Sequence, residues 1–183
     1  MLNWIQWRLN RENYKDISDW HIKLIDTFLE NPKLTKLLYY TDFAPLEQPD
    51  LTPKQLKEVY RRHIIPSKPS TFQSSDPVTS IYFYLDDVTE SWFFIEGKLV
   101  VKIITPHHLI NIKEGTRNML LAQEIVNSTH SISFFFVHGL NFEKQDQKDT
   151  FEGDYDLIEL HDHHVQIPKK FLLSTWKFLK KYW

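Results

Sequence analysis

The chain has 183 residues, the size of a single domain with a core of its own, and its formal charge of −2 gives no general attraction for nucleic acid or anionic membranes. It has no cysteine, which excludes disulfides, thiolate metal sites and a cysteine nucleophile, and its four glycines are too few for glycine-rich phosphate-binding loops. Aromatic residues make up 15% of the chain, a high share, and no stretch approaches the roughly 20 apolar residues of a membrane span.

The first residues of the chain predict helices. Residues 1–15 mix tryptophans with charged residues and are predicted to be an N-terminal arm, packed on its own domain or reaching to a neighbouring subunit. From Ile17 to Leu29 apolar residues recur every three or four positions, which predicts a helix capped at its start by Asp16 or Ser18. Asn31 is predicted to cap a second, short helix that has a proline in its first turn.

A loop stiffened by prolines, Tyr39 to Asp50, separates this helix from the next one. The run Thr52-Pro53-Lys54-Gln55 matches a capping box with proline at the first helical position. Ile64, Ile65 and Pro66 are predicted to end that helix. Residues 66–79 are rich in proline, serine and threonine and predict a surface loop.

From Ser80 onward the apolar period changes from 3.6 to 2, which predicts strands. Residues 92–105 are predicted to form a hairpin that turns at Glu96-Gly97-Lys98. Further along, the pattern predicts, in this order, a helix over Gly115–Ser128, strands over 131–139 and 153–165, and a helix opened by Pro168.

Strands outnumber the helices that could cross over between them, which favours an α+β fold with a mainly antiparallel sheet of about five strands and helices packed on it. The predicted organisation is one domain: the arm at 1–15, a core at 16–165, and a basic amphipathic helix at 166–183.

One dense cluster of potential metal ligands occurs, His161-Asp162-His163-His164. In an extended strand Glu159, His161 and His163 share one face, a donor set that suits zinc or iron. Three interpretations stay open: an exposed polar strand end, the metal site of an enzyme that could also use His107 or His108, or a subunit contact or pH-responsive cluster.

The C-terminal segment carries lysines interleaved with aromatic residues and has no acidic residue after Val165. Such a helix can dock on its own domain, bind another subunit, contact nucleic acid or a membrane surface, or serve a small interaction protein, such as an inhibitor, as its binding element. No nucleophile elbow is present, and we predict no catalytic residue, no cofactor and no enzymatic activity.

The stretch LLYYTDFAPLEQPDLTPKQLKEVYRRHIIP resembles a family of tailed-bacteriophage neck proteins, of the tail-terminator or head–tail joining type. The residue pattern of Leu37–Pro53 carries the resemblance. Over roughly residues 20–160 the resemblance continues only in the order of the predicted helices and strands. The aromatic arm and the basic C-terminal helix depart from the family pattern.

The resemblance implies an α+β subunit of a virion ring, often of six copies, that is assembled in the host cytoplasm. Its partners would be other copies of itself and neighbouring connector, tail-tube or sheath proteins, with no specific nucleic acid and no membrane. Terminal arms and aromatic residues suit such contacts, because closed rings join two different faces of each copy. The predicted interface residues are Tyr39, Tyr40, Asp42, Phe43, Leu46, Arg61, Arg62, Trp176, Lys180 and Trp183.

Overall fold

The structure is a computed structural model that describes residues 2–68, 78–91, 94–130 and 155–168. For residues 2–14, 130, 161–164 and 168 it describes the backbone alone. The helices are α1 (Leu2–Glu30), α2 (Pro32–Tyr39), η1 (Pro45–Glu47), α3 (Pro53–Arg62), α4 (His107–Ile110) and α5 (Arg117–His130). The strands are β1 (Ile64–Ile65), β2 (Ser80–Glu90), β3 (Phe94–Pro106), β4 (Asn111–Ile112), β5 (Gly115–Thr116) and β6 (Tyr155–Pro168).

The main sheet has the strand order β1-β2-β3-β6 within the described residues. The pairs β2–β3 and β3–β6 are antiparallel, and the short β1 pairs in parallel with β2. Strands β4 and β5 form a separate two-stranded ribbon. The α+β class with a mainly antiparallel sheet is therefore confirmed.

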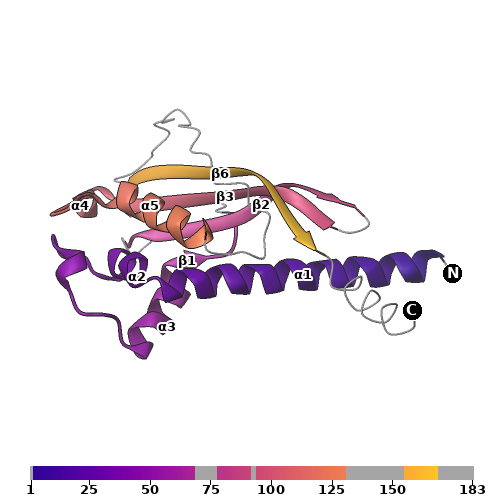
Figure 1. The fold of residues 1–183 in the computed structure, drawn as a ribbon, viewed down its shortest axis with the longest axis horizontal. Coiled ribbons are helices and arrows are strands. Elements are labelled where there is room, and N and C mark those ends of the chain that lie inside the picture. The colour runs from indigo at the N-terminus through magenta and orange to yellow at the C-terminus, as the bar shows by residue number, and fades with distance from the viewer. Residues whose placement is uncertain (1, 69–77, 92–93, 131–154, 169–183) are drawn as a thin grey trace.

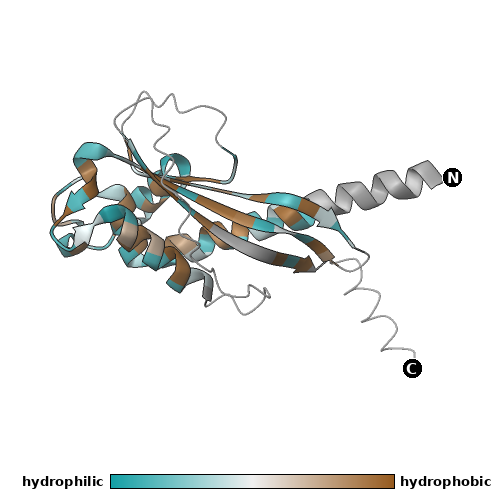
Figure 2. Ribbon diagram, turned by 90° about the horizontal axis from the view of Figure 1, so that it is seen from above, coloured by the Kyte–Doolittle hydropathy of each residue, from teal (hydrophilic) through white to brown (hydrophobic). Residues whose placement is uncertain are grey.

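The core lies between the sheet and the helices α1, α2, α3 and α5, which gather on one side of the sheet (Figure 1). Alternate residues of β2 and β3 point into it, because successive side chains of a strand face opposite ways. Phe83 of β2 is fully buried and meets the ring of Phe28 of α1 edge-on at 6.0 Å. Figure 2 shows hydrophobic residues along the strands and on the helices.

Helix α1 differs from the prediction, because it runs without a break from Leu2 to Glu30. The arm and the helix expected after it are one element, and Asp16 lies inside α1 with its side chain buried, so it is not a cap. The physical reason is that residues 2–30 contain no proline and no glycine, so nothing interrupts the backbone hydrogen bonds.

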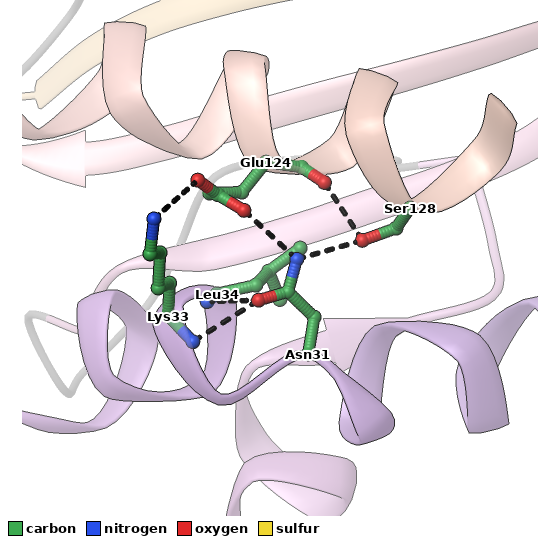
Figure 3. A network of polar contacts seen from close by, with 5 residues as sticks. All are labelled: Asn31, Lys33, Leu34, Glu124 and Ser128. Atoms are coloured by element: carbon green, nitrogen blue, oxygen red, sulfur yellow. Dashed lines mark hydrogen bonds and ion pairs between the residues drawn. The ribbon is translucent and has the colours of Figure 1, made fainter. Parts of the chain in front are cut away.

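The start of α2 is confirmed at Asn31. Its side-chain oxygen accepts hydrogen bonds from the backbone N–H groups of Lys33 (3.0 Å) and Leu34 (3.1 Å), as an N-cap does (Figure 3). The amide nitrogen of the same side chain donates to Glu124 Oε2 at 3.0 Å and to Ser128 Oγ at 2.9 Å on α5. One side chain thus caps α2 and joins it to α5.

The start of α3 also follows the prediction. The Gln55 side chain accepts a hydrogen bond from the backbone N–H of Thr52 at 2.9 Å and one from its hydroxyl at 2.7 Å. The chain leaves α3 directly into β1, so Ile64 and Ile65 form a strand where the sequence predicts only the end of a helix. Two residues are too short for a period of 2 to be visible.

The predicted hairpin turn at Gly97 is wrong, because β3 continues through Gly97 and the chain turns before Phe94. Gly97 is buried, and the register of β3 shifts next to it in the pairing with β2 and in the pairing with β6. A Cβ added there would lie 3.1 Å from the carbonyl oxygen of Asp86. The glycine therefore serves a close approach of two backbones.

The end of the last strand differs from the prediction, because β6 continues past Val165 to Pro168. Pro168 is the last residue of β6 and does not open a helix within the described residues. The strand predicted over 131–139 and the helix predicted to follow Pro168 lie outside the residues that the structure describes.

We predict that Asn31→Ala lowers the free energy of unfolding by about 2 kcal/mol, because it removes both cap hydrogen bonds and both bonds to α5. Urea unfolding followed by circular dichroism measures the change. Asn127→Ala is the matched control, because Asn127 is exposed on α5 and should lose less than about 0.5 kcal/mol. Equal losses in the two variants would contradict the prediction.

A second prediction concerns His63, which is buried and donates a hydrogen bond from Nδ1 to the carbonyl oxygen of Thr79 at 2.7 Å. Burial lowers the pKa of His63 below its usual 6.5, and burial lowers the pKa of His21 in the same way. Below pH 6.5 the unfolded chain therefore binds more protons than the folded one, so the free energy of unfolding falls as the pH falls.

Urea unfolding at pH 7.5, 6.5 and 5.5 measures this dependence. His63→Asn keeps a donor for Thr79 but cannot be protonated, so its stability should fall less than that of the wild type over this range. His21 retains its contribution in the variant. An unchanged pH dependence would show that His63 has no part in it.

Candidate functional site

The predicted Tyr39–Asp50 loop is organised by Arg117, the first residue of α5. Arg117 is 1% exposed. Its Nη1 donates to the carbonyl oxygens of Leu37 and Tyr40 (the latter at 2.7 Å), and its Nη2 donates to that of Asp42 at 3.2 Å. Its Nε donates to the carbonyl oxygen of Leu109 at 2.8 Å. One side chain thus joins the end of α2 and the loop to α4.

Arg117 has no carboxylate among these partners; carbonyl groups hold its charge. The carbonyls of Leu37 and Tyr40 belong to the C-terminal end of α2, where the helix dipole is negative and favours a cation. Burial lowers the pKa of Arg117 to about 10, while the charges of Asp42 and Glu114 oppose that shift. The side chain stays protonated at neutral pH.

Further contacts hold the loop along its length. The backbone N–H of Lys113, in the β4–β5 turn, donates to the carbonyl oxygen of Phe43 at 2.7 Å. The Lys113 ammonium forms an ion pair with Glu47. The Tyr40 hydroxyl donates to the carbonyl oxygen of Pro49 at 3.2 Å.

The end of the loop is attached to α2 by an ion pair between Lys36 Nζ and Asp50 at 2.8 Å. Pro45 is buried at the start of η1, and Leu46 packs against the core. The loop is therefore tied to α2, to the β4–β5 turn and to α5, and its backbone is fixed from both ends.

The structure brings five predicted interface residues together on this loop: Tyr39, Tyr40, Asp42, Phe43 and Leu46. The rings of Tyr39 and Tyr40 meet edge-on at 5.3 Å, and both side chains are half-buried. Phe43 is different, because 66% of its surface is exposed. Its backbone is held on both sides of its Cα, since its own carbonyl oxygen and that of Asp42 both accept hydrogen bonds. The loop thus presents an exposed aromatic side chain on a fixed backbone.

The other predicted interface residues lie elsewhere. Arg61 and Arg62 are exposed on α3, and Arg62 forms an ion pair with Glu58 at 3.0 Å. Trp176, Lys180 and Trp183 lie outside the described residues, as does the helix predicted to carry them.

The predicted metal ligands are not gathered in the part of the chain that the structure describes. Glu159 pairs with Lys102 across the sheet, and the side chains of His161 and His163 are not among those described. His107 and His108 are exposed on the single turn of α4. No group of three potential ligands occurs among the described residues.

Arg117 was not among the residues that the sequence predicted to be functional. It lies one turn before the apolar residues of α5, at a helix N-terminus, where the dipole disfavours a positive charge. A cation in that position next to an apolar stripe indicates a partner outside its own helix, and this is the signal that could have found it.

The fold and the loop define an α+β domain with a mainly antiparallel sheet and one fixed, exposed loop. The chain belongs to the YomW family, whose model matches residues 31–161, from the cap of α2 into β6. The family name is of the type given to prophage genes and states no function. No curated protein and no solved structure gives a significant match. Within the described residues no helix is long and apolar enough to cross a membrane.

We predict that Arg117→Met lowers the free energy of unfolding by at least about 3 kcal/mol, because four carbonyl oxygens lose a buried donor. Arg117→Lys should be nearly as harmful, because an ammonium cannot reproduce the planar fork. Arg61→Met is the matched control, since Arg61 is exposed and should change stability by less than about 0.5 kcal/mol. Chemical denaturation compares the three variants, and a loss below 1 kcal/mol in Arg117→Met would refute the role given to this residue.

Proposed function

We propose that this protein is a structural component of a bacteriophage particle, a ring-forming tail terminator or joining protein at the head–tail junction. In that role it closes or connects the tail against the head connector and performs no chemistry. The observation that carries the proposal is the fixed loop that presents Phe43.

Two lines of support concern the family. The YomW name is of the prophage type, which is consistent with a phage gene product. The stretch that resembles phage neck proteins, Leu37–Pro53, lies within the matched region and coincides with the end of α2 and the fixed loop.

The physical support is the preorganisation of the loop. Binding through a mobile segment loses affinity because the segment must be ordered first, and a fixed backbone avoids that loss. Aromatic side chains dominate the binding energy of many interfaces, and one exposed on a fixed backbone is suited to insert into a partner's pocket. A loop that covered a pocket would instead need freedom to open.

The nature of ring assembly adds a requirement. Each copy must present two different faces that complement each other, so that successive contacts close into a ring. The Phe43 loop is one such face in this proposal. Its partner is a neighbouring copy or an adjoining neck protein.

We predict that Phe43→Ala weakens assembly at least tenfold without changing stability, because the phenyl ring of Phe43 is exposed in the free subunit but buried in the proposed contact. Met119→Ala is the matched control: Met119 is also a large exposed apolar residue, 60% exposed, but lies on α5. Sedimentation velocity measures the assembly of the purified protein. Quantitative mass spectrometry of induced phage particles measures its incorporation.

A wild-type protein that is monomeric at all concentrations and absent from purified particles would overturn the proposal. Assembly that is equally weakened by Phe43→Ala and Met119→Ala would overturn the role of the loop alone.

A further inference from the structure

The C-terminal half of α1 carries an exposed acidic stripe. Ile22, Asp26 and Glu30 follow one another at intervals of four residues, so they lie along one side of the helix, and all three are exposed. Ile22 is 53% exposed and is one of five large hydrophobic residues that are exposed in the described part of the chain. We call these three residues the acidic α1 stripe.

Helix α3 carries the opposite pattern. Lys54, Lys57 and Arg61 occupy positions separated by three and four residues, and Tyr60 borders them with 49% of its surface exposed. We call these four residues the basic α3 face. Each surface therefore combines charges of one sign with one exposed large apolar or aromatic side chain.

These charges have no ion-pair partners inside the described part of the chain. Asp26 and Glu30 form no ion pair there, and neither do Lys54, Lys57 and Arg61. The charges of the two surfaces are not neutralised by the neighbouring residues that do have partners. These neighbours are Arg62, which pairs with Glu58 next to the basic α3 face, and Asp19 and Lys23 next to the acidic α1 stripe.

Three of the charges also oppose the field of their own helix. Asp26 and Glu30 stand in the last two turns of α1, which has no basic residue in its last turn, although the negative helix end favours cations there. They also repel each other at a spacing of four residues. Lys54 stands in the first turn of α3, where an anion would be favoured. Charges that disfavour their own helices are expected where another function requires them.

We propose that the acidic α1 stripe of one copy binds the basic α3 face of a second copy of this chain. The two surfaces are complementary in charge, and contact lets Ile22 and Tyr60 cover each other. The inference rests on the proposed assembly, to which it adds a pair of faces that join neighbouring copies in addition to the Phe43 loop.

Nucleic acid is the other anionic partner that a basic helix face can attract. The net charge of −2 opposes it, and phosphate groups would leave Ile22 exposed and the acidic stripe without a role. A second copy satisfies both surfaces at once.

Charge reversal tests the contact. Lys57→Glu with Arg61→Glu makes the α3 face acidic, and Asp26→Lys with Glu30→Lys makes the α1 stripe basic. Each double variant should raise the dissociation constant for self-association at least tenfold in sedimentation velocity at 0.15 M salt. The quadruple variant should recover to within threefold of wild type, because the two faces are then complementary with reversed signs.

Two controls keep the test interpretable. Gln123→Glu with Asn127→Glu adds negative charge to two exposed positions of α5 and should leave self-association unchanged. If a reversed variant does not fold, as judged by circular dichroism, the neutral set Lys57→Gln with Arg61→Gln and Asp26→Asn with Glu30→Gln replaces it, and each neutral pair should weaken association at least threefold.

The outcomes separate this inference from the proposed function. If the wild type self-associates and neither double variant weakens that association, the α1–α3 contact is overturned and the ring is built through other faces. The same conclusion follows if the quadruple variant fails to restore the association. Loss of binding to a duplex DNA probe in Lys57→Glu with Arg61→Glu, with unchanged self-association, also overturns it in favour of a nucleic-acid surface. A wild-type protein that never self-associates overturns both.

Discussion

The position of the exposed loop depends on one buried cation. The guanidinium of Arg117 donates to backbone carbonyls at the end of α2, in the loop that follows it and in α4, so two segments far apart in the sequence share one side chain. A buried guanidinium is tolerated only where its N–H donors are hydrogen-bonded, and removing either the donor or the acceptor leaves a buried polar group unpaired. Because the carbonyls are backbone groups, the arrangement fixes where the chain runs and places few demands on the side chains of the loop.

A second polar contact sets the other end of α2. Asn31 caps that helix and binds Glu124 and Ser128 on α5 with the remaining nitrogen of its amide, so α2 is attached to α5 at its start through Asn31 and at its end through Arg117. Apolar packing alone is non-directional and would allow α2 to slide along α5. The two polar contacts specify the register, and the register specifies where the loop emerges.

How far the sequence predicted this structure depended on the range of each interaction. The caps at Asn31 and Thr52 and the fold class were predictable, because they follow from neighbouring residues and from periodicity. Gly97 was mistaken for a turn because only its approach to the neighbouring strand, invisible in the sequence, explains it. The loop at Tyr39–Asp50 was predicted as a surface loop, but Arg117 lies about 70 residues further along the chain, and no local pattern connects the two.

The groups that fix this loop differ from the aromatic group that it exposes. The contacts that fix it use backbone carbonyls, Lys36, Lys113 and Arg117, whereas the exposed ring of Phe43 takes part in none of them. The same holds for the charged surfaces of α1 and α3, whose exposed residues lie opposite buried ones such as Phe28 and Val59. Because the exposed groups make no contribution to the core, they can change to match a partner while the scaffold stays the same, which is the arrangement that the proposed role in an assembly requires.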